Sequence, residues 1–241
     1  MGEGIQWSPY LGEMKEEINQ LPIREIKEWN GHDLTPAREF RTSQGYGGFM
    51  AYGTEKVEKI GIGDCVINGV VHYGLCTIFP SEDYDLPIFV STWEERENEI
   101  TFLVDLMPTV DSLIDEEYRK RYFDSIQRLW ERYSNLPGIC PEEDDVIRSL
   151  CSIVYNAARV PLDREGMRLA ALAPHTEYLK AYLGFLKDVS PVADDTKRKE
   201  LKRKREAIRQ TLRAHYEELL KGPTGKALGK DISELMIHMF F

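Results

Sequence analysis

The sequence predicts a single α/β (α+β) domain over residues 1–241, with a central antiparallel sheet between helices. Three observations favour this fold class. Strand patterns and a hairpin turn are concentrated between residues 56 and 106, helical periodicity dominates after Pro108, and neither a repeat nor a linker divides the chain. With 42% hydrophobic residues, the chain of 241 residues has enough apolar side chains for a core of its own.

The first segment, residues 9–30, is expected to be helical. Its apolar side chains lie near helical spacing: Leu11, Met14, Ile18 and Leu21, followed beyond Pro22 by Ile23, Ile26 and Trp29. The glycine-rich stretch at residues 44–49 matches neither GxGxxG nor the GxxxxGK[ST] phosphate loop. We therefore expect a turn or the start of a flexible strand there.

The clearest local signal is the dipeptide Asn68-Gly69 between two apolar runs, which is typical of a type I′ hairpin turn. It predicts two long antiparallel arms. Together with two later apolar runs, the expected strands cover residues 57–67, 70–79, 86–93 and 100–106.

Helical periodicity predicts the second half of the chain. The expected helices cover residues 118–133, 146–159, 177–186, 195–220 and 232–241. In the helix at 195–220, apolar residues recur at steps of 7, 4 and 7 from Leu201 through Ile208 and Leu212 to Leu219. This spacing places them on one buried face, so the other faces are expected to show the nine cations of this helix.

The charge of the chain is unevenly distributed. The net charge is −10, but residues 197–213 carry nine basic and two acidic residues, a local +7 against −17 elsewhere. The overall balance argues against a nucleic-acid or anionic-lipid partner, while the basic helix suits an acidic protein partner. No segment approaches the roughly 20 apolar residues of a membrane span, and no signal peptide is apparent, so we expect a cytoplasmic protein.

Metal and nucleophile motifs are missing from the sequence. Four cysteines lack CxxC spacing, five histidines form no HExxH pair, and no GxSxG elbow occurs. We therefore expect no metal site and no hydrolase chemistry. Any electrons that the protein uses would come from a bound small molecule or from a partner.

A block of residues between 57 and 109 resembles the ferredoxin-dependent bilin reductase family, in a phycocyanobilin reductase-like pattern. The residues that carry the resemblance are Phe79-Pro80, Tyr84, Leu86-Pro87-Ile88-Phe89, Asp105-Leu106 and Pro108-Thr109, and the preceding hairpin aligns without a gap. Weaker similarity continues through Tyr118, Leu136-Pro137 and the last helix.

The resemblance implies a three-layer α/β/α sandwich that encloses a linear tetrapyrrole of the biliverdin type. It further implies an oxidoreductase with no tightly bound cofactor, which receives single electrons from ferredoxin. The basic helix is the expected docking surface for ferredoxin, with Lys199, Arg203 and Arg209 facing away from the Leu201 stripe.

The sequence departs from the family at every acid position. The family's two polar residues on the first hairpin arm fall on Gly61 and Gly63, its histidine on the second arm falls on Leu75, and its proton-donating aspartate falls on Thr92. The catalytic residues are therefore unknown from the sequence, and the family reaction or its regiochemistry is in doubt. The alternatives are a non-catalytic tetrapyrrole carrier and an interaction protein that retains only the fold.

Alternation along the two arms predicts which side chains share a face. Cys65, Tyr73 and Thr77 stand with the two glycines and Leu75, whereas His72 and Cys76 point to the other face. Small residues at these positions predict a roomier cavity for a bulkier or cyclic tetrapyrrole, with Cys65, Tyr73 and Thr92 as polar contacts. The alternative is a cavity refilled by side chains from the helices.

Tetrapyrrole carboxylates need cationic or hydrogen-bonding partners. By the resemblance, Arg132 and Ser134 lie near the family's anchor on the central helix, and Lys221 lies near its C-terminal anchor. An ordinary surface role is equally compatible with these three residues.

Overall fold

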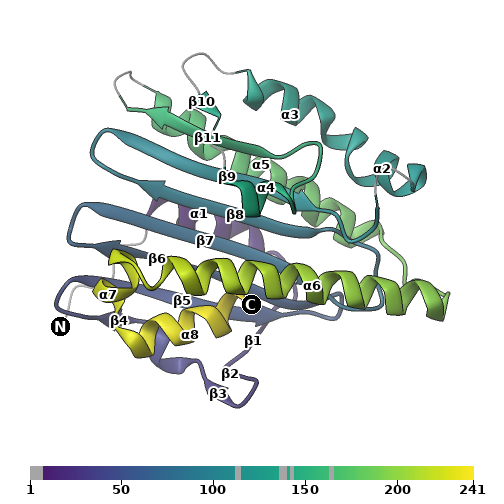
Figure 1. Cartoon of the computed structure of the whole chain (residues 1–241). Helices are drawn as coiled ribbons and strands as arrows, with labels where there is room; N and C mark the ends of the chain where they lie inside the picture. Colours follow the sequence, from purple (N-terminus) through teal and green to yellow (C-terminus); the bar gives the residue numbers. More distant parts are fainter. Residues whose placement is uncertain (1–7, 112–114, 136–139, 142–143, 163–165) are drawn as a thin grey trace.

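The computed structural model describes residues 8–111, 115–135, 140–141, 144–162 and 166–241. Its centre is a nine-stranded antiparallel sheet in the order β1-β5-β6-β7-β8-β9-β11-β10, with β4 also paired to β5 (Figure 1). The expected α+β fold with a central antiparallel sheet is confirmed. A separate two-stranded hairpin, β2–β3, lies beside this sheet.

The strands are short at the edges and long in the centre. Their bounds are β1 Arg24–Glu25, β2 Glu28–Trp29, β3 His32–Asp33, β4 Phe40–Arg41, β5 Gly45–Gly53, β6 Val57–Ile67, β7 Val71–Pro80, β8 Ile88–Glu95, β9 Glu99–Met107, β10 Cys140–Pro141 and β11 Asn156–Pro161. The predicted arms correspond to β6 and β7. Asn68 and Gly69 join them with φ of 51° and 69°, as a type I′ turn requires.

Helices cover both faces of the sheet (Figure 1). Their bounds are α1 Pro9–Ile18, α2 Glu116–Tyr122, α3 Gln127–Ser134, α4 Asp145–Arg148, α5 Met167–Asp188, α6 Asp195–Leu219, α7 Pro223–Leu228 and α8 Lys230–Phe240, with 3-10 turns at Thr35–Ala37 and Asp124–Ile126. One apolar core lies between the sheet and α1, α2, α3 and α5, and a second lies between the sheet and α6, α7 and α8. The chain therefore forms the expected α/β/α sandwich.

The predicted helix at 9–30 ends at Ile18, so its continuation beyond Pro22 is wrong. Arg24–Glu25 instead pairs with the edge of β5, and the Ile26 N–H donates to the Ala51 carbonyl at 2.8 Å. Asn30 and Gly31, with φ of 49° and 79°, then close the β2–β3 hairpin. The Asn-Gly signal that predicted the central hairpin is thus repeated here, within shorter strands.

The predicted helix at 146–159 is also wrong after its first turn. Helix α4 ends at Arg148, and the backbone N–H and hydroxyl of Ser152 donate to the buried carboxylate of Asp105 at 2.9 and 2.5 Å. Residues 156–161 then form β11 on the edge of β9. These long-range hydrogen bonds outweigh the local helical pattern.

The predicted helix at 118–133 is broken into α2 and α3 by a 3-10 turn, while α6 follows its prediction closely. Leu201, Ile208 and Leu212 are buried as expected, but Leu219 is 50% exposed. The face of α6 also buries Arg205, so not every cation of this helix reaches solvent. Within the described part of the chain, no helix is long and apolar enough to span a bilayer.

Candidate functional site

The face of the sheet toward α6 and α8 is the one that the alternation predicted. Cys65 and Leu75 are buried in the core beneath these helices, and the Thr77 hydroxyl donates to the Phe240 carbonyl of α8 at 3.0 Å. Cys76 packs in the opposite core. Leu75 lies directly across from Thr92 in the β7–β8 register, so the family's acid positions do meet on one face.

The space beside the two glycines is filled. A Cβ at Gly61 would lie 2.6 Å from the Met239 carbonyl oxygen and 2.8 Å from the Phe240 ring, and one at Gly63 would overlap the Phe49 ring at 2.5 Å. Helix α8 and the neighbouring strand therefore occupy the volume that larger side chains would take. The expectation of a roomier cavity at these positions is wrong. The alternative of refilling from the helices holds at Gly61, whereas strand β5 fills the space at Gly63.

A pocket remains further along the same face, between β7–β9, β11, α4 and the C-terminal half of α6. Its volume is about 330 Å³, which falls within the range of small-molecule sites. The lining side chains combine apolar walls with a few polar groups: Tyr73, Val90, Thr92, Leu103, Arg148, Cys151, Tyr155, Ala157, Leu212, His215 and Tyr216, among others. Of the sequence-predicted site residues, the structure brings Tyr73 and Thr92 together here.

Two tyrosine hydroxyls meet at this pocket. Tyr73 on β7 lies beside Tyr216 on α6, and burial raises the pKa of Tyr216 to about 12 and raises that of Tyr73 well above its usual value. Both phenols therefore stay protonated at neutral pH and can donate hydrogen bonds. The apolar stripe of α6 places Tyr216 there, because it follows Leu212 by one helical turn.

A buried carboxylate lies behind the pocket wall. Asp105 on β9 is fully buried, and burial raises its pKa to about 6 despite the hydrogen bonds from Ser152. The thiol of Cys151, which lines the pocket, lies beside this carboxylate. Asp105 is thus an acid with a pKa near neutrality, one side chain away from the pocket.

Charged groups stand at the α4 side of the same pocket. His215 Nε2 of α6 lies 3.7 Å from an Asp144 carboxylate oxygen, and Arg148 lines the pocket from the last turn of α4. The guanidinium of Arg148 and the imidazole of His215 are suited to bind a ligand carboxylate. Neither residue was distinguishable from a surface residue in the sequence.

The other predicted ligand contacts lie elsewhere. Arg132 and Ser134 are exposed on α3, which belongs to the helical layer on the opposite face of the sheet, and Arg132 pairs with Glu177 at 2.9 Å. Lys221 is exposed beyond α6 and pairs with Glu218. Cys65 is adjacent to Tyr73 in the β6–β7 register but is buried outside the pocket lining.

The basic helix α6 is largely paired within the molecule. Lys197, Arg198 and Lys202 form ion pairs with the acidic turn at residues 82–85. The side chain of Arg209 is only 18% exposed, pairs with Glu58 at 2.5 Å and lies over the Phe79 ring, so the expectation that it faces solvent is wrong.

Lys199 and Arg203 are exposed as expected. They form no ion pair with the described residues, and neither does the exposed Lys204. A wider hollow of about 980 Å³ runs beside Lys199 and Arg203, but most of its lining residues are charged, with both signs mixed. The apolar pocket on the sheet is therefore the better candidate for a small-molecule site.

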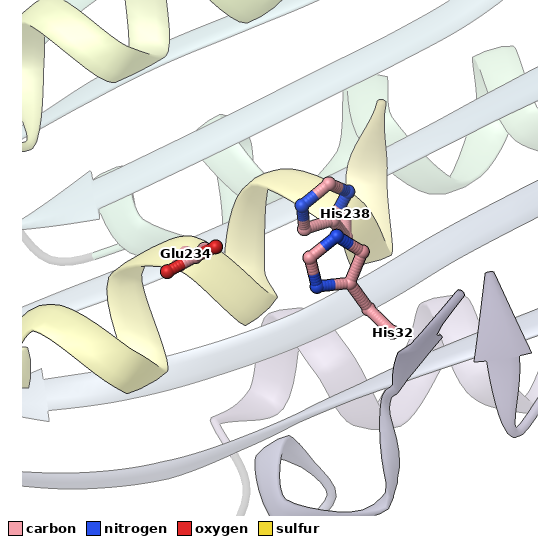
Figure 2. A group of neighbouring side chains, drawn as sticks. All are labelled: His32, Glu234 and His238. Atoms are coloured by element: carbon pink, nitrogen blue, oxygen red, sulfur yellow. The ribbon is translucent and has the colours of Figure 1, made fainter. Parts of the chain in front are cut away.

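One group of described residues has the composition of a metal site. The ligand atoms of His32, Glu234 and His238 all lie within 4.8 Å of one another, at the junction of the β2–β3 hairpin and α8 (Figure 2). No spacing signal in the sequence points to this cluster, because His32 and His238 are more than 200 residues apart.

No family model matches the chain, and no curated protein matches it either. The fold is nevertheless that of the ferredoxin-dependent bilin reductases, which confirms the resemblance at the level of the fold. The phytochromobilin synthase from tomato, crystallised in complex with biliverdin, superimposes with a TM-score of 0.74 at 16% sequence identity, covering 95% of this chain and 81% of that chain.

Proposed function

We propose that this protein is a bilin reductase-like oxidoreductase that binds a linear tetrapyrrole of the biliverdin type. The observation that carries the proposal is the 330 Å³ pocket on the sheet face toward α6, in a fold whose tomato relative was crystallised with biliverdin. Leu103, Leu212 and Val90 supply apolar walls for pyrrole rings. Arg148 and His215 would hold the propionates.

Reduction of one bilin double bond consumes two electrons and two protons. The electrons would arrive singly from a reduced ferredoxin, since the proposed enzyme uses no tightly bound cofactor of its own. The protons require an acid close to the pigment. Glu94 and Asp144 line the pocket directly, and Asp105 lies behind Cys151 in its wall. We assign the proton transfer to Asp105, because burial raises its pKa to about 6 and keeps it partly protonated near neutrality.

A non-catalytic tetrapyrrole carrier is the second candidate. It is favoured by the replacement of the family's acids by Gly61, Gly63, Leu75 and Thr92, and by the packing of α8 over Gly61 and of Phe49 against Gly63. On this alternative the pocket would hold the pigment without supplying protons to it.

Titration with biliverdin tests the binding step. We expect the visible absorbance spectrum of biliverdin to change on mixing with the protein, and reduced ferredoxin to change it further in a reductase but not in a carrier. Replacing Ala157 in the pocket wall by Trp should weaken binding by at least about tenfold, because the indole fills the cavity. Leu169→Trp, at a site 69% exposed on α5, is the matched control.

The outcomes separate the hypotheses. Binding by the wild type and by Leu169→Trp, but not by Ala157→Trp, supports the pocket. An unchanged biliverdin spectrum with the folded wild type would exclude both tetrapyrrole functions and leave an interaction protein on the same scaffold.

A further inference from the structure

The cluster of His32, Glu234 and His238 lies outside the proposed pigment pocket and has no part in the function proposed above. Glu234 and His238 are four residues apart on α8, so they stand on the same side of successive helical turns. The imidazole of His32 approaches from the β2–β3 hairpin (Figure 2). Two elements from opposite ends of the chain thus bring three potential ligands together.

The buried member of the cluster has an unused ligand atom. His238 is 6% exposed, and its Nδ1 has no hydrogen-bond partner among the described residues. Leaving a buried polar nitrogen unpaired costs stability, and such an atom calls for an explanation. A metal ion bound at Nδ1 would provide one.

The distances are close to those of a zinc site. Two ligand atoms on one tetrahedral Zn²⁺ ion lie about 3.3 Å apart, given bond lengths of about 2.0 Å. The three ligand atoms here are within 4.8 Å of one another without an ion. Rotation of exposed side chains is enough to close the difference, because Glu234 is exposed and His32 is only partly buried.

The present arrangement of the two imidazoles is a stack. Their centroids are 3.7 Å apart and their planes differ by 21°. Both nitrogen lone pairs lie in the ring planes, so one ion cannot bind two stacked rings and the His32 ring must turn on binding. The two-residue strands of the separate β2–β3 sheet leave His32 free to do so.

Neighbouring charges also bear on binding. Lys59 is fully buried, and its ammonium donates to the His238 carbonyl at 3.3 Å. The Glu234 carboxylate supplies one negative charge to the site.

We propose that His32, Glu234 and His238 form a Zn²⁺ site that clamps the β2–β3 hairpin to α8. Two imidazoles and one carboxylate are a donor set that suits zinc, with a fourth position for water. Because α8 also covers Gly61 and caps the second core, the ion would stabilise the helix that closes this face of the sheet.

Metal titration of the full chain tests the site. After removal of metals with a chelator, Co²⁺ is the spectroscopic probe and Zn²⁺ the ligand for calorimetry and thermal melting. We expect one equivalent of Co²⁺ to give the intense visible absorption of a four-coordinate ion, Zn²⁺ to displace it, and Zn²⁺ to raise the melting temperature.

The variants His32→Gln and Glu234→Gln should each weaken Zn²⁺ binding by more than roughly tenfold. Removing a residue that only hydrogen-bonds to a metal ligand already weakens binding by about tenfold, and removing a ligand should cost more. Both residues are at least partly exposed, so the metal-free variants should melt like the wild type. Asp231→Asn on the same helix and His215→Gln in the pigment pocket are the controls, and neither should change binding.

Equal Zn²⁺ affinity of wild type, His32→Gln and Glu234→Gln would overturn the proposal, as would the lack of any Co²⁺ absorption at millimolar metal. Hydrogen exchange adds a structural readout. Zn²⁺ should slow amide exchange in residues 28–33 of the wild type but not of Glu234→Gln, and unchanged exchange in the wild type would contradict the clamp.

Discussion

Asp105 shows how a single residue can serve the fold and the site together. Its carboxylate holds the turn before β11 through Ser152, and its raised pKa suits it to supply a proton from behind the pocket wall. The cost of burying this charge should appear in the pH dependence of stability. A carboxyl whose pKa rises on folding binds its proton more tightly in the folded state, so its contribution to stability falls as pH rises.

For Asp105 the window runs from the ordinary value of 3.8 to about 6. We therefore expect the stability difference between Asp105→Asn and wild type to shift in favour of the variant by on the order of 3 kcal/mol between pH 4 and pH 7. Urea unfolding of both proteins across this range measures the shift. Comparison with the variant removes the opposite contribution of buried His175, whose pKa is lowered to about 3. A constant difference would show that folding does not raise the pKa of Asp105.

The same substitution separates structure from chemistry. If Asp105 supplies a proton, Asp105→Asn should bind biliverdin normally but reduce it more slowly by about 100-fold or more. Normal reduction by the folded variant would assign Asp105 to the structure alone.

At the scale of elements, the contact between β6 and α8 fills the sheet face beside Gly61, and the pocket lies between β7–β9, β11, α4 and α6. Gly61 lets the helix backbone approach the sheet, since a Cβ there would lie 2.6 Å from the Met239 carbonyl oxygen. A backbone contact of this kind cannot be relieved by moving one flexible side chain. The docking of α8 at this distance therefore depends on a glycine at position 61.

Gly61→Ala should destabilise the protein by about 1–3 kcal/mol through overpacking against α8. Gly184→Ala in α5 is the control, because a Cβ there meets no atom within 4 Å. That change should stabilise the helix by about 0.5–1 kcal/mol. Chemical denaturation of both variants measures the two effects, and an unchanged midpoint for Gly61→Ala would mean that α8 shifts at no cost.

At the scale of the whole molecule, folding brings the cations of α6 next to acidic residues from other parts of the chain. The +7 segment of α6 faces the acidic turn at residues 82–85, and its ion pairs neutralise much of it. Lys199, Arg203 and Lys204 remain as a small exposed patch without ion pairs to described residues. If ferredoxin docks on α6, this patch is where its acidic surface would be steered.

Reversing Lys199 and Arg203 together to Glu should raise the KM for ferredoxin several-fold at low ionic strength, and the difference from wild type should shrink in high salt. Lys120→Glu on α2, a site 63% exposed, is the control. Steady-state bilin reduction at two salt concentrations measures this. An unchanged KM at low salt would exclude this patch from docking.

Local sequence determined the elements whose hydrogen bonds and apolar faces are close in the chain. The Asn68-Gly69 turn set the β6–β7 hairpin, alternation assigned Cys65 and Leu75 to one face, and the period of Leu201, Ile208 and Leu212 located α6. The resemblance between residues 57 and 109 also identified the fold. These signals hold because each depends on neighbours within a few residues.

Only the tertiary structure decided the pocket, the filled space over Gly61, the partners of Arg209 and the His32–His238 cluster. Each of these depends on contacts between segments separated by scores of residues, which leave no periodicity or spacing in the sequence. For the same reason the segment after α4 became β11, since its hydrogen bonds to Asp105 and β9 outweighed a local helical pattern.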